Sequence, residues 1–450
     1  MNKKLEMLKR WTVGLTSVFF ISGTAPFSAQ QTVSLQDAIN QALSNKAEAK
    51  KASAEIRRAE LKIDEAKAGA LPQISAQGSI NYNPIIQQSL LVFDGQSLIA
   101  EMGQKWTSGI TATVNQALFD QRVFTGLKAA KSTREFYVLN AELTNEQIIE
   151  NVATAYYQVF VQEENLRTLE ASYDNTEKVR DIIKSLVDNG LAKPIDLDRT
   201  NVQLTNIGSS RQQLVNAVEL SKNALKFYMG VPITQQITLV ETDIDPRPEM
   251  LLSDVNLEER SELKVLAKQR ELLEFNKEAT EAYLYPTVGL SASYGWAGMG
   301  NKFPLTHGLK DNVLWSDAMA IGLNINIPIF SGGATRSKIE QTKIDIENLE
   351  TDIADTKLAL SLDHQNAISN IENSLINLEN MKENVSLAER VHENTQSNYQ
   401  YGLANLTELL DAQNALTDAK QNYATALLDY KLAEIKLIKA KGQLKNLQTP

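Results

Sequence analysis

The fold is decided by a stretch that begins Ala318-Met319-Ala320-Ile321-Gly322-Leu323-Asn324-Ile325-Asn326-Ile327-Pro328-Ile329-Phe330. Its large apolar residues alternate with small or polar ones, and this period of two predicts a β-strand with one apolar face. After Ser331-Gly332-Gly333 the chain continues to Gln400 without Pro or Gly, which predicts a helix about 100 Å long. A strand joined to so long a helix is typical of a protein that crosses a membrane as a barrel and leaves it as a helical tube.

The composition of the 450-residue chain favours long solvated helices over one thick core, since 43% of the residues are hydrophobic and only 6% are aromatic. The net charge of −10 argues against a nucleic-acid partner. The sequence has no cysteine, which excludes disulfides, thiolate metal sites, a cysteine nucleophile and a lipid anchor on cysteine. The lack of cysteine also fits an oxidising compartment.

Residues 1–29 are predicted to form an export signal. Lys3, Lys4, Lys9 and Arg10 precede an apolar run from Val13 to Ile21, and small residues follow it. Phe27 fits poorly with the small residues preferred before a cleavage site near Ala29, and a buried N-terminal helix is the alternative interpretation. No later apolar run is long enough to predict a transmembrane helix.

Three short motifs recur in the second half of the chain at nearly the same offset. Leu71-Pro72-Gln73-Ile74 corresponds to Tyr285-Pro286-Thr287-Val288, 214 positions later. Leu118-Phe119 corresponds to Ile329-Phe330, 211 positions later, and Asn189-Gly190-Leu191-Ala192 corresponds to Tyr401-Gly402-Leu403-Ala404, 212 positions later. Three ordered matches at such similar offsets predict an internal structural repeat.

The repeat divides the chain into two equivalent parts, each expected to run helix, strand, loop, strand, long helix, tip and helix. The first repeat spans residues 30–230, a linker spans 231–256 and the second repeat spans 257–450. We expect strands at about 73–83, 107–119, 286–297 and 317–330, and tips at about 188–194 and 400–406. Residues 83–105 and 297–315 are expected to be loops without regular structure.

These elements predict an α+β fold in which a membrane β-barrel continues into a long α-helical barrel. Strands of about ten residues are long enough to cross a bilayer when they are tilted. Four strands cannot close a barrel, and open edges in lipid would leave backbone groups unpaired, so the chain must oligomerise. A barrel of about eight strands is filled by side chains, whereas the twelve strands of a homotrimer enclose a lumen.

Three segments resemble the TolC family of outer-membrane efflux proteins. Residues 66–75 (AKAGALPQIS) resemble its helix-to-strand joint, residues 328–333 (PIFSGG) resemble its second strand-to-helix joint, and residues 401–413 (YGLANLTELLDAQ) resemble its periplasmic tip. The likeness covers nearly the whole chain after the export signal, in order and in duplicate. It implies a channel in the outer membrane of a Gram-negative bacterium with a large periplasmic part. Such a channel is a passive conduit that is opened by a periplasmic adaptor protein and an inner-membrane pump of RND or ABC type.

The resemblance also gives two acidic residues a role in the channel. Glu408 and Asp411 are three positions apart and therefore share one face of a helix. In the family, acidic residues at both positions form a selectivity ring at the closed end, and three copies around an axis favour bound cations. The alternative interpretation of the pair is an ordinary solvated helix face.

The family's closed state is held by polar links between the two tips, and by position these links involve Asp196 and Tyr399. The family's gate-linking arginine, two residues after the tip glycine, is replaced by Ala404 in this chain. Lys193 and Arg199 are the candidate substitutes for that arginine.

Two further surfaces are candidates for contacts with partners. Gly190-Leu191-Ala192 and Gly402-Leu403-Ala404 are turns that, as family tips, would dock the adaptor, because an exposed leucine at a hairpin end is an anchor. Trp106, Trp296 and Trp315 flank the predicted strands, which suits an aromatic girdle at the membrane surface, with loop packing as the alternative.

No motif indicates catalysis. The glycines between Gly295 and Gly300 lie on a strand end, and Ser331-Gly332-Gly333 lacks the lysine of a phosphate-binding loop. His307, His364 and His392 are too widely separated to suggest a metal site. We therefore expect no enzyme activity, no metal and no cofactor. An exported coiled-coil scaffold or adhesin without a pore stays open as the alternative function.

Overall fold

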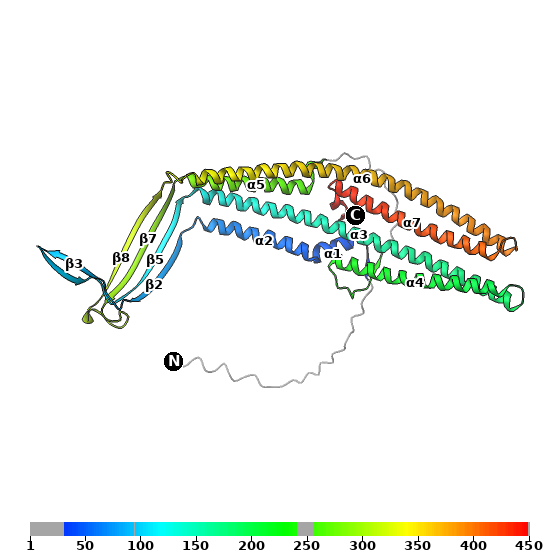
Figure 1. The fold of residues 1–450 in the computed structure, drawn as a ribbon, viewed down its shortest axis with the longest axis horizontal. Coiled ribbons are helices and arrows are strands. Elements are labelled where there is room, and N and C mark those ends of the chain that lie inside the picture. Colours follow the sequence, from blue (N-terminus) through cyan, green and yellow to red (C-terminus); the bar gives the residue numbers. More distant parts are fainter. Residues whose placement is uncertain (1–30, 94, 241–255, 449–450) are drawn as a thin grey trace, which may run out of the picture.

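The computed structural model describes residues 31–93, 95–240 and 256–448, so the predicted export signal lies outside the described residues. The molecule is an elongated rod of helices with a β-sheet at one end and two helical hairpin tips at the other (Figure 1). The last described element, the 3-10 helix Leu444–Gln448, lies near the middle of the rod. The sheet and the tips therefore lie at opposite ends of the molecule.

Two long helices, α3 (Gln121–Asp188) and α6 (Ala334–Gln400), run along the rod and carry the shorter helices. Toward the sheet they pack against α2 (Ala47–Ala68) and α5 (Ser261–Glu281), and toward the tips against α4 (Pro194–Met229) and α7 (Leu406–Ala440). Short helix α1 (Leu35–Asn45) lies at mid-length. Among the described residues, short 3-10 helices lie at Leu257–Glu259, Ala282–Leu284, Leu309–Asp311 and Leu444–Gln448.

The larger apolar core lies at the middle of the rod. There strand β1 (Gln31–Val33) pairs in parallel with β6 (Ile237–Leu239), so the expected linker contains a short strand. The Tyr156 ring is fully buried in this core, and its hydroxyl donates to the Val33 carbonyl at 3.3 Å. Large apolar side chains are buried here because the helices pack around the β1–β6 pair. Toward the two ends of the rod the helix pairs bury fewer side chains.

Four antiparallel strands form the sheet at the end of the rod, in the order β2-β5-β7-β8. They are β2 (Gln73–Tyr82), β5 (Trp106–Phe119), β7 (Thr287–Gly300) and β8 (Val313–Asn326). One strand pair comes from each repeat, and the pairs meet where β5 lies beside β7. Strands β2 and β8 each have one side without a partner in the described chain.

The second-repeat strands lie at different residues from those expected. Strand β8 ends at Asn326 rather than near 330, because its partner β7 begins at Thr287, directly after Pro286, which has no N–H to donate. At the outer end both strands extend into the expected loop, and Gly300 pairs with Val313. Gly298 permits this extension, since a Cβ there would lie 2.5 Å from the Trp315 ring.

The first-repeat connection between β2 and β5 is also more regular than expected. It contains a hairpin of β3 (Gln88–Phe93) and β4 (Gln96–Glu101), which projects past the end of the sheet (Figure 1). Its apolar run does not alternate, so the periodicity of the sequence does not reveal it.

Candidate functional site

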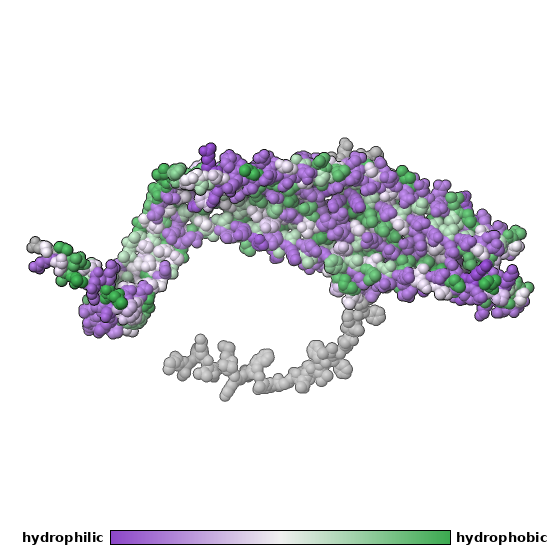
Figure 2. Space-filling model, viewed as in Figure 1, coloured by the Kyte–Doolittle hydropathy of each residue, from purple (hydrophilic) through white to green (hydrophobic). Residues whose placement is uncertain are grey.

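One face of the four-stranded sheet is apolar. The register places Ile74, Val114, Ala292 and Ile321 in one cross-strand row, and directly opposed residues share a face. Large apolar residues of this face that are at least half exposed in the protomer are Ile74, Ile80, Tyr82, Ile110, Tyr294, Met319, Ile321, Leu323 and Ile325. Figure 2 shows the sheet as mostly pale and green beside a predominantly purple helical rod. So much exposed apolar surface on one sheet face is suited to lipid rather than water.

The opposite face of the sheet is polar. The neighbouring row consists of Ser75, Thr113, Ser293 and Ala320, and the Ser75 and Thr113 hydroxyls share a hydrogen bond of 2.8 Å. Farther along, the Asn324 side-chain amide donates to the Ser291 hydroxyl at 2.9 Å. A sheet with one apolar and one polar face is the arrangement of a membrane barrel whose interior holds water.

The three predicted girdle tryptophans lie together at the outer end of the sheet. The Trp106 ring lies 4.6 Å from that of Tyr82, and the Trp296 ring lies 4.4 Å from that of Trp315. The Trp315 indole N–H donates to the Pro304 carbonyl at 3.2 Å. The structure therefore gathers these rings in one zone, which also packs against the loop between β7 and β8.

At the other end of the rod, each long helix stops in the same way. Gly190 and Gly402 have positive φ angles of 70° and 73°, which L side chains rarely adopt. The next N–H donates back to the helix in each case, from Leu191 to the Leu186 carbonyl and from Leu403 to the Asn398 carbonyl, both at 2.8 Å. This is the Schellman arrangement. It leaves Leu191 and Leu403 more than three-quarters exposed.

Glu408 and Asp411 are exposed on the first two turns of α7. The Glu408 carboxylate accepts hydrogen bonds from the Asn405 side-chain amide at 2.9 Å and from the Asn405 backbone N–H at 3.4 Å. In return, the Asn405 side-chain oxygen accepts from the Glu408 N–H at 3.0 Å. Glu408 therefore completes a capping box at the start of the helix, a role beyond the predicted acidic ring.

The tip helices of the two repeats touch through polar side chains. The Arg199 guanidinium on α4 donates to the Thr407 hydroxyl on α7 at 3.2 Å, and the Gln203 amide donates to the Asn414 side-chain oxygen at 2.6 Å. Both bonds join α4 of the first repeat to α7 of the second repeat.

Asp196 and Tyr399 also lie near each other at the tip. Partial burial raises the pKa of the Tyr399 phenol, and the Asp196 carboxylate raises it further. The neutral phenol is therefore the stable form in this position and can donate a hydrogen bond. Ala404 is half-buried, and Arg199, one of the two candidate substitutes for the missing arginine, is the residue that contacts Thr407.

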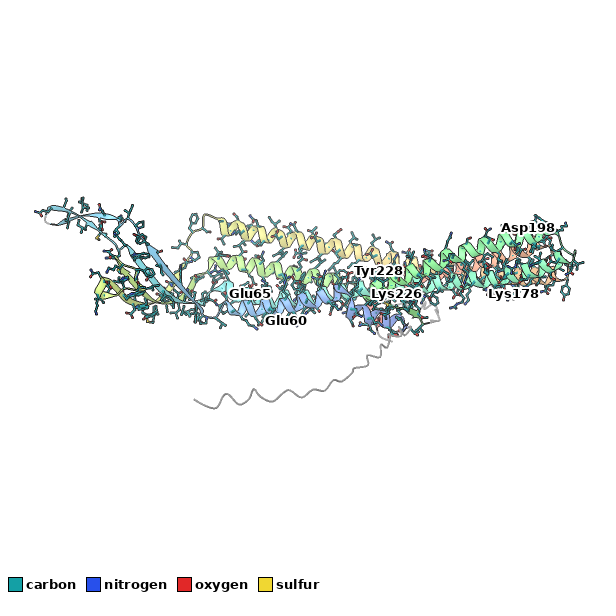
Figure 3. All side chains as sticks on the ribbon, turned by 90° about the horizontal axis from the view of Figure 1, so that it is seen from below. Glu60, Glu65, Lys178, Asp198, Lys226 and Tyr228 are labelled. Carbon is teal, nitrogen blue, oxygen red and sulfur yellow. The ribbon has the colours of Figure 1, made fainter. Side chains whose placement is uncertain are left out.

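Charged side chains cover the rod between the two ends. Figure 3 shows them from Glu60 and Glu65 near the sheet to Lys178 and Asp198 near the tips. Most of their ion pairs are exposed, so they contribute to solubility more than to stability. Within the described ranges, no helix is long and apolar enough to cross a membrane, and no group of three or more acidic or histidine residues could hold a metal.

Residues 38–231 and 252–443 match the family described as outer membrane efflux protein. The chain belongs to this family. It is 23% identical to the outer membrane protein TolC of Salmonella enteritidis over 448 residues, which cover 99% of this chain and 87% of that protein. It is 21% identical to the proteases secretion protein PrtF of Dickeya chrysanthemi over 355 residues, covering 77% and 73% of the two chains.

Solved structures of channels share the fold. The outer membrane protein VceC of Vibrio cholerae has a TM-score of 0.70 at 19% identity, with 91% of this chain and 96% of that chain covered. The open state of the MtrE channel of Neisseria gonorrhoeae has a TM-score of 0.68 at 17% identity, with 92% and 91% covered.

The protein is therefore an outer-membrane channel of Gram-negative efflux and secretion systems. Channels of this family are transport proteins without enzymatic activity, and they form trimers in tripartite systems. The alternative of a coiled-coil scaffold or adhesin without a pore is set aside by the family match and by the amphipathic sheet.

Proposed function

We propose that this chain assembles as a homotrimer whose sheets close into one twelve-stranded barrel. The observation that carries the proposal is the four-stranded sheet with an apolar face, a polar face and two free edges, β2 and β8. Free edges in lipid would leave backbone N–H and C=O groups unpaired, at several kcal/mol each. Pairing β2 of one copy with β8 of the next satisfies these groups and turns the polar faces inward.

The helices of the three copies would then continue the barrel as a tube. Each copy supplies two pairs of helices at every level of the rod, α2–α3 and α5–α6 near the sheet and α3–α4 and α6–α7 near the tips. The apolar positions along these helices are sparse, so a wide ring of helices suits them better than a tight bundle.

The tip would be the gate of this tube. Threefold symmetry would bring three copies of Glu408 and of Asp411 around the axis, and such a ring of carboxylates favours cations over anions. Both residues lie near the start of α7, within reach of the narrow end. The capping box orients the Glu408 carboxylate, which keeps the ring at a fixed height.

The closed state would be held by the contacts between α4 and the second repeat. Arg199–Thr407 and Gln203–Asn414 are hydrogen bonds across the repeats, and Asp196 with Tyr399 adds a polar neighbour pair. Arg199 takes the place of the arginine that the family has where this chain has Ala404. Opening the tip would require these contacts to separate, because α4 and α7 can diverge only after the bonds break.

The partners would be a periplasmic adaptor protein and an inner-membrane pump. Leu191 and Leu403 stand exposed at the two tips, beside Gly190, Ala192, Gly402 and Ala404, and would insert into apolar pockets of the adaptor. Some relatives are named for efflux pumps and another for protease secretion, so both RND-type and ABC-type pumps suit the proposal. The Trp106, Trp296 and Trp315 rings would mark the outer membrane surface as a girdle.

The test is conductance of the purified protein in planar bilayers. We expect three chains per particle and a small, cation-preferring current that rises severalfold when Arg199 and Gln203 are both replaced by alanine. Arg211→Ala is the matched control, because its ion pair with Glu170 at 3.0 Å links α4 to α3 within one repeat and should leave the current unchanged. A monomeric particle, or a double variant that conducts like the parent, would overturn the proposal.

A further inference from the structure

The β3–β4 hairpin exposes apolar side chains on both of its faces. Leu90 opposes Ile99 and Leu91 opposes Leu98, and successive cross-strand pairs face opposite sides. In the described chain its strands pair only with each other, and the hairpin stands clear of the helices (Figures 1 and 3). Six large apolar residues along it are more than half exposed: Ile85, Leu90, Val92, Leu98, Ile99 and Met102. An isolated two-stranded hairpin is at best marginally stable in water, so this one requires a partner surface.

The hairpin is fixed to the edge of the sheet. The Asn83 N–H donates to the Lys105 carbonyl at 2.7 Å, and the Met102 N–H donates to the Gln87 carbonyl at 2.9 Å. The first bond extends the β2–β5 ladder past Tyr82, the last residue of β2, and the second extends the β3–β4 ladder toward it. Because β2 is an edge strand, the hairpin lies at the border between one copy and the next.

The proposed trimer determines what lies across that border. Strand β2 runs away from the helices and β8 runs toward them, so a seam between them brings Tyr82 of one copy near Val313 of the next. Residues 301–312 directly precede Val313 and carry Leu305 and Leu309, both more than half exposed. The apolar hairpin and this apolar segment would therefore be neighbours at the outer end of the barrel.

Lipid is less suited than a neighbouring copy to cover the apolar surface of the hairpin. The hairpin lies beyond Trp106 and its aromatic neighbours, and such rings lie at the boundary between membrane and water. Charge also favours the neighbouring copy, since Glu101 at the base of the hairpin and Lys310 on the 301–312 segment carry opposite signs. We propose that the β3–β4 hairpin docks on residues 301–312 of the neighbouring copy and ties adjacent protomers together at the outer mouth of the channel. This inference rests on the proposed trimer.

The cysteine-free sequence permits a direct test by cross-linking. The purified Leu98→Cys/Leu309→Cys double variant is treated with a short bismaleimide and separated on a denaturing gel. We expect most chains to appear as covalent dimers and trimers, and each single variant to stay monomeric. The control is Leu98→Cys/Leu362→Cys, because Leu362 is 60% exposed and Leu98 is 59% exposed, but Leu362 lies far away on α6.

Other outcomes overturn the inference in distinguishable ways. Dimers from Leu98→Cys alone would show that hairpins meet one another, and an absence of covalent dimers and trimers in a particle of three chains would show a free hairpin. A particle of one chain would overturn the proposed function as well. As a second measurement, Leu98→Ser/Ile99→Ser should lower the temperature at which the trimer dissociates while leaving the conductance unchanged. An unchanged dissociation temperature would also overturn the docking.

Discussion

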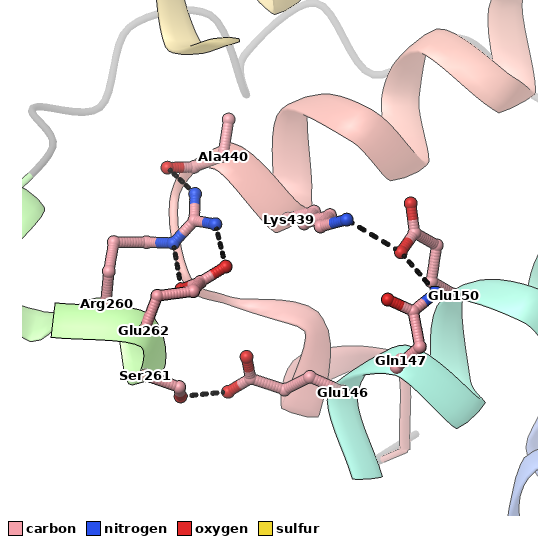
Figure 4. Close-up of polar contacts among 8 residues, drawn as sticks. All are labelled: Glu146, Gln147, Glu150, Arg260, Ser261, Glu262, Lys439 and Ala440. Atoms are coloured by element: carbon pink, nitrogen blue, oxygen red, sulfur yellow. Dashed lines mark hydrogen bonds and ion pairs between the residues drawn. The ribbon is translucent and has the colours of Figure 1, made fainter. Parts of the chain in front are cut away.

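Lys46 and Arg260 are equivalent residues of the two repeats, 214 positions apart, and each donates a hydrogen bond to the end of a helix that returns from a tip. Lys46 Nζ reaches the Phe227 carbonyl of α4 at 3.1 Å, and Arg260 Nη1 reaches the Ala440 carbonyl of α7 at 2.9 Å (Figure 4). Helix C-termini carry partial negative charge, so a cation is favourable there. Each contact, called a joint below, connects the start of a helix in the sheet half of the rod, α2 or α5, to the end of a helix in the tip half, α4 or α7.

The joint in the second repeat should be the stronger of the two. Arg260 is 4% exposed and also makes two bonds to the Glu262 carboxylate, at 2.6 and 3.1 Å. Lys46 is 8% exposed and adds only weaker contacts, which are cation–π contacts with Phe227 at 3.6 Å and Tyr228 at 5.6 Å and a long ion pair with Glu48 at 3.9 Å. Arg260→Ala leaves the half-buried Glu262 unpaired and should cost about 2–4 kcal/mol. Lys46→Ala should cost about 1–2 kcal/mol.

Thermal unfolding followed by helical circular dichroism checks this order. Arg58→Ala is the control, because its pair with Glu55 is exposed and should contribute at most about 0.5 kcal/mol. If the Arg260→Ala variant unfolds at the same temperature as the Arg58→Ala control, the Arg260 contact does not stabilise the fold.

A buried carboxylate beside the same joint should make stability depend on pH. Burial raises the pKa of Glu146 above its ordinary value of 4.5, and the nearby Glu262 carboxylate adds to the rise. The Ser261 hydroxyl, which donates to Glu146 at 2.6 Å, opposes the rise, as do Lys445 and Arg260. The folded protein therefore holds this proton more tightly than the unfolded chain does, so stability falls as pH rises from 4.5 through the raised pKa.

Glu146→Gln should remove that loss, since the amide keeps an acceptor oxygen for Ser261 and carries no charge. We expect the variant to melt at a higher temperature than the parent near pH 8 and at the same temperature near pH 4. Melting curves recorded between pH 4 and pH 8 test the sign of this difference in melting temperature. A gain of equal size at both pH values would mean that packing, and not ionisation, is responsible.

The sequence alone predicts the architecture well, and the reasons are local. Alternation of apolar and polar residues sets the face of each strand, so Ile321 and Ala320 could be assigned to opposite faces without coordinates. The repeat offset likewise links Lys46 with Arg260 once one member of the pair is known.

Two features that the sequence did not predict have no signal in its periodicity. Strand β8 stops at Asn326 because β7 starts at Thr287, which the alternation through Ile327 and Ile329 does not reveal. The hairpin at Leu90 and Leu91 has no alternation at all. The capping role of Glu408, by contrast, does have a local signal, because Asn405 lies three residues earlier, but the resemblance to the family's acidic ring implies a different role.

Opposite faces of strand β8 should respond oppositely to charge. Ile321→Lys places an ammonium group on the apolar face near mid-strand, which should cost about 2–4 kcal/mol if that face meets lipid. Ala320→Lys places the same group on the polar face and should be tolerated. The measurement is the fraction of chains recovered in the outer membrane as a heat-modifiable trimer. Equal recovery of the two variants would contradict the assignment of the faces.

The two roles of Glu408 can be separated by one pair of substitutions. Glu408→Gln keeps one acceptor oxygen for the Asn405 backbone N–H, which meets the carboxylate at 3.4 Å, so the capping box survives without the charge and only the exposed bond from the Asn405 side-chain amide at 2.9 Å is lost. Glu408→Ala removes both the charge and the cap. We expect the cation preference, measured as a reversal potential under a salt gradient, to fall severalfold in both variants and in Asp411→Asn. Only Glu408→Ala should also lower the melting temperature. If Glu408→Gln keeps the cation preference of the parent, then Glu408 serves the helix as a cap and does not contribute to a selectivity ring.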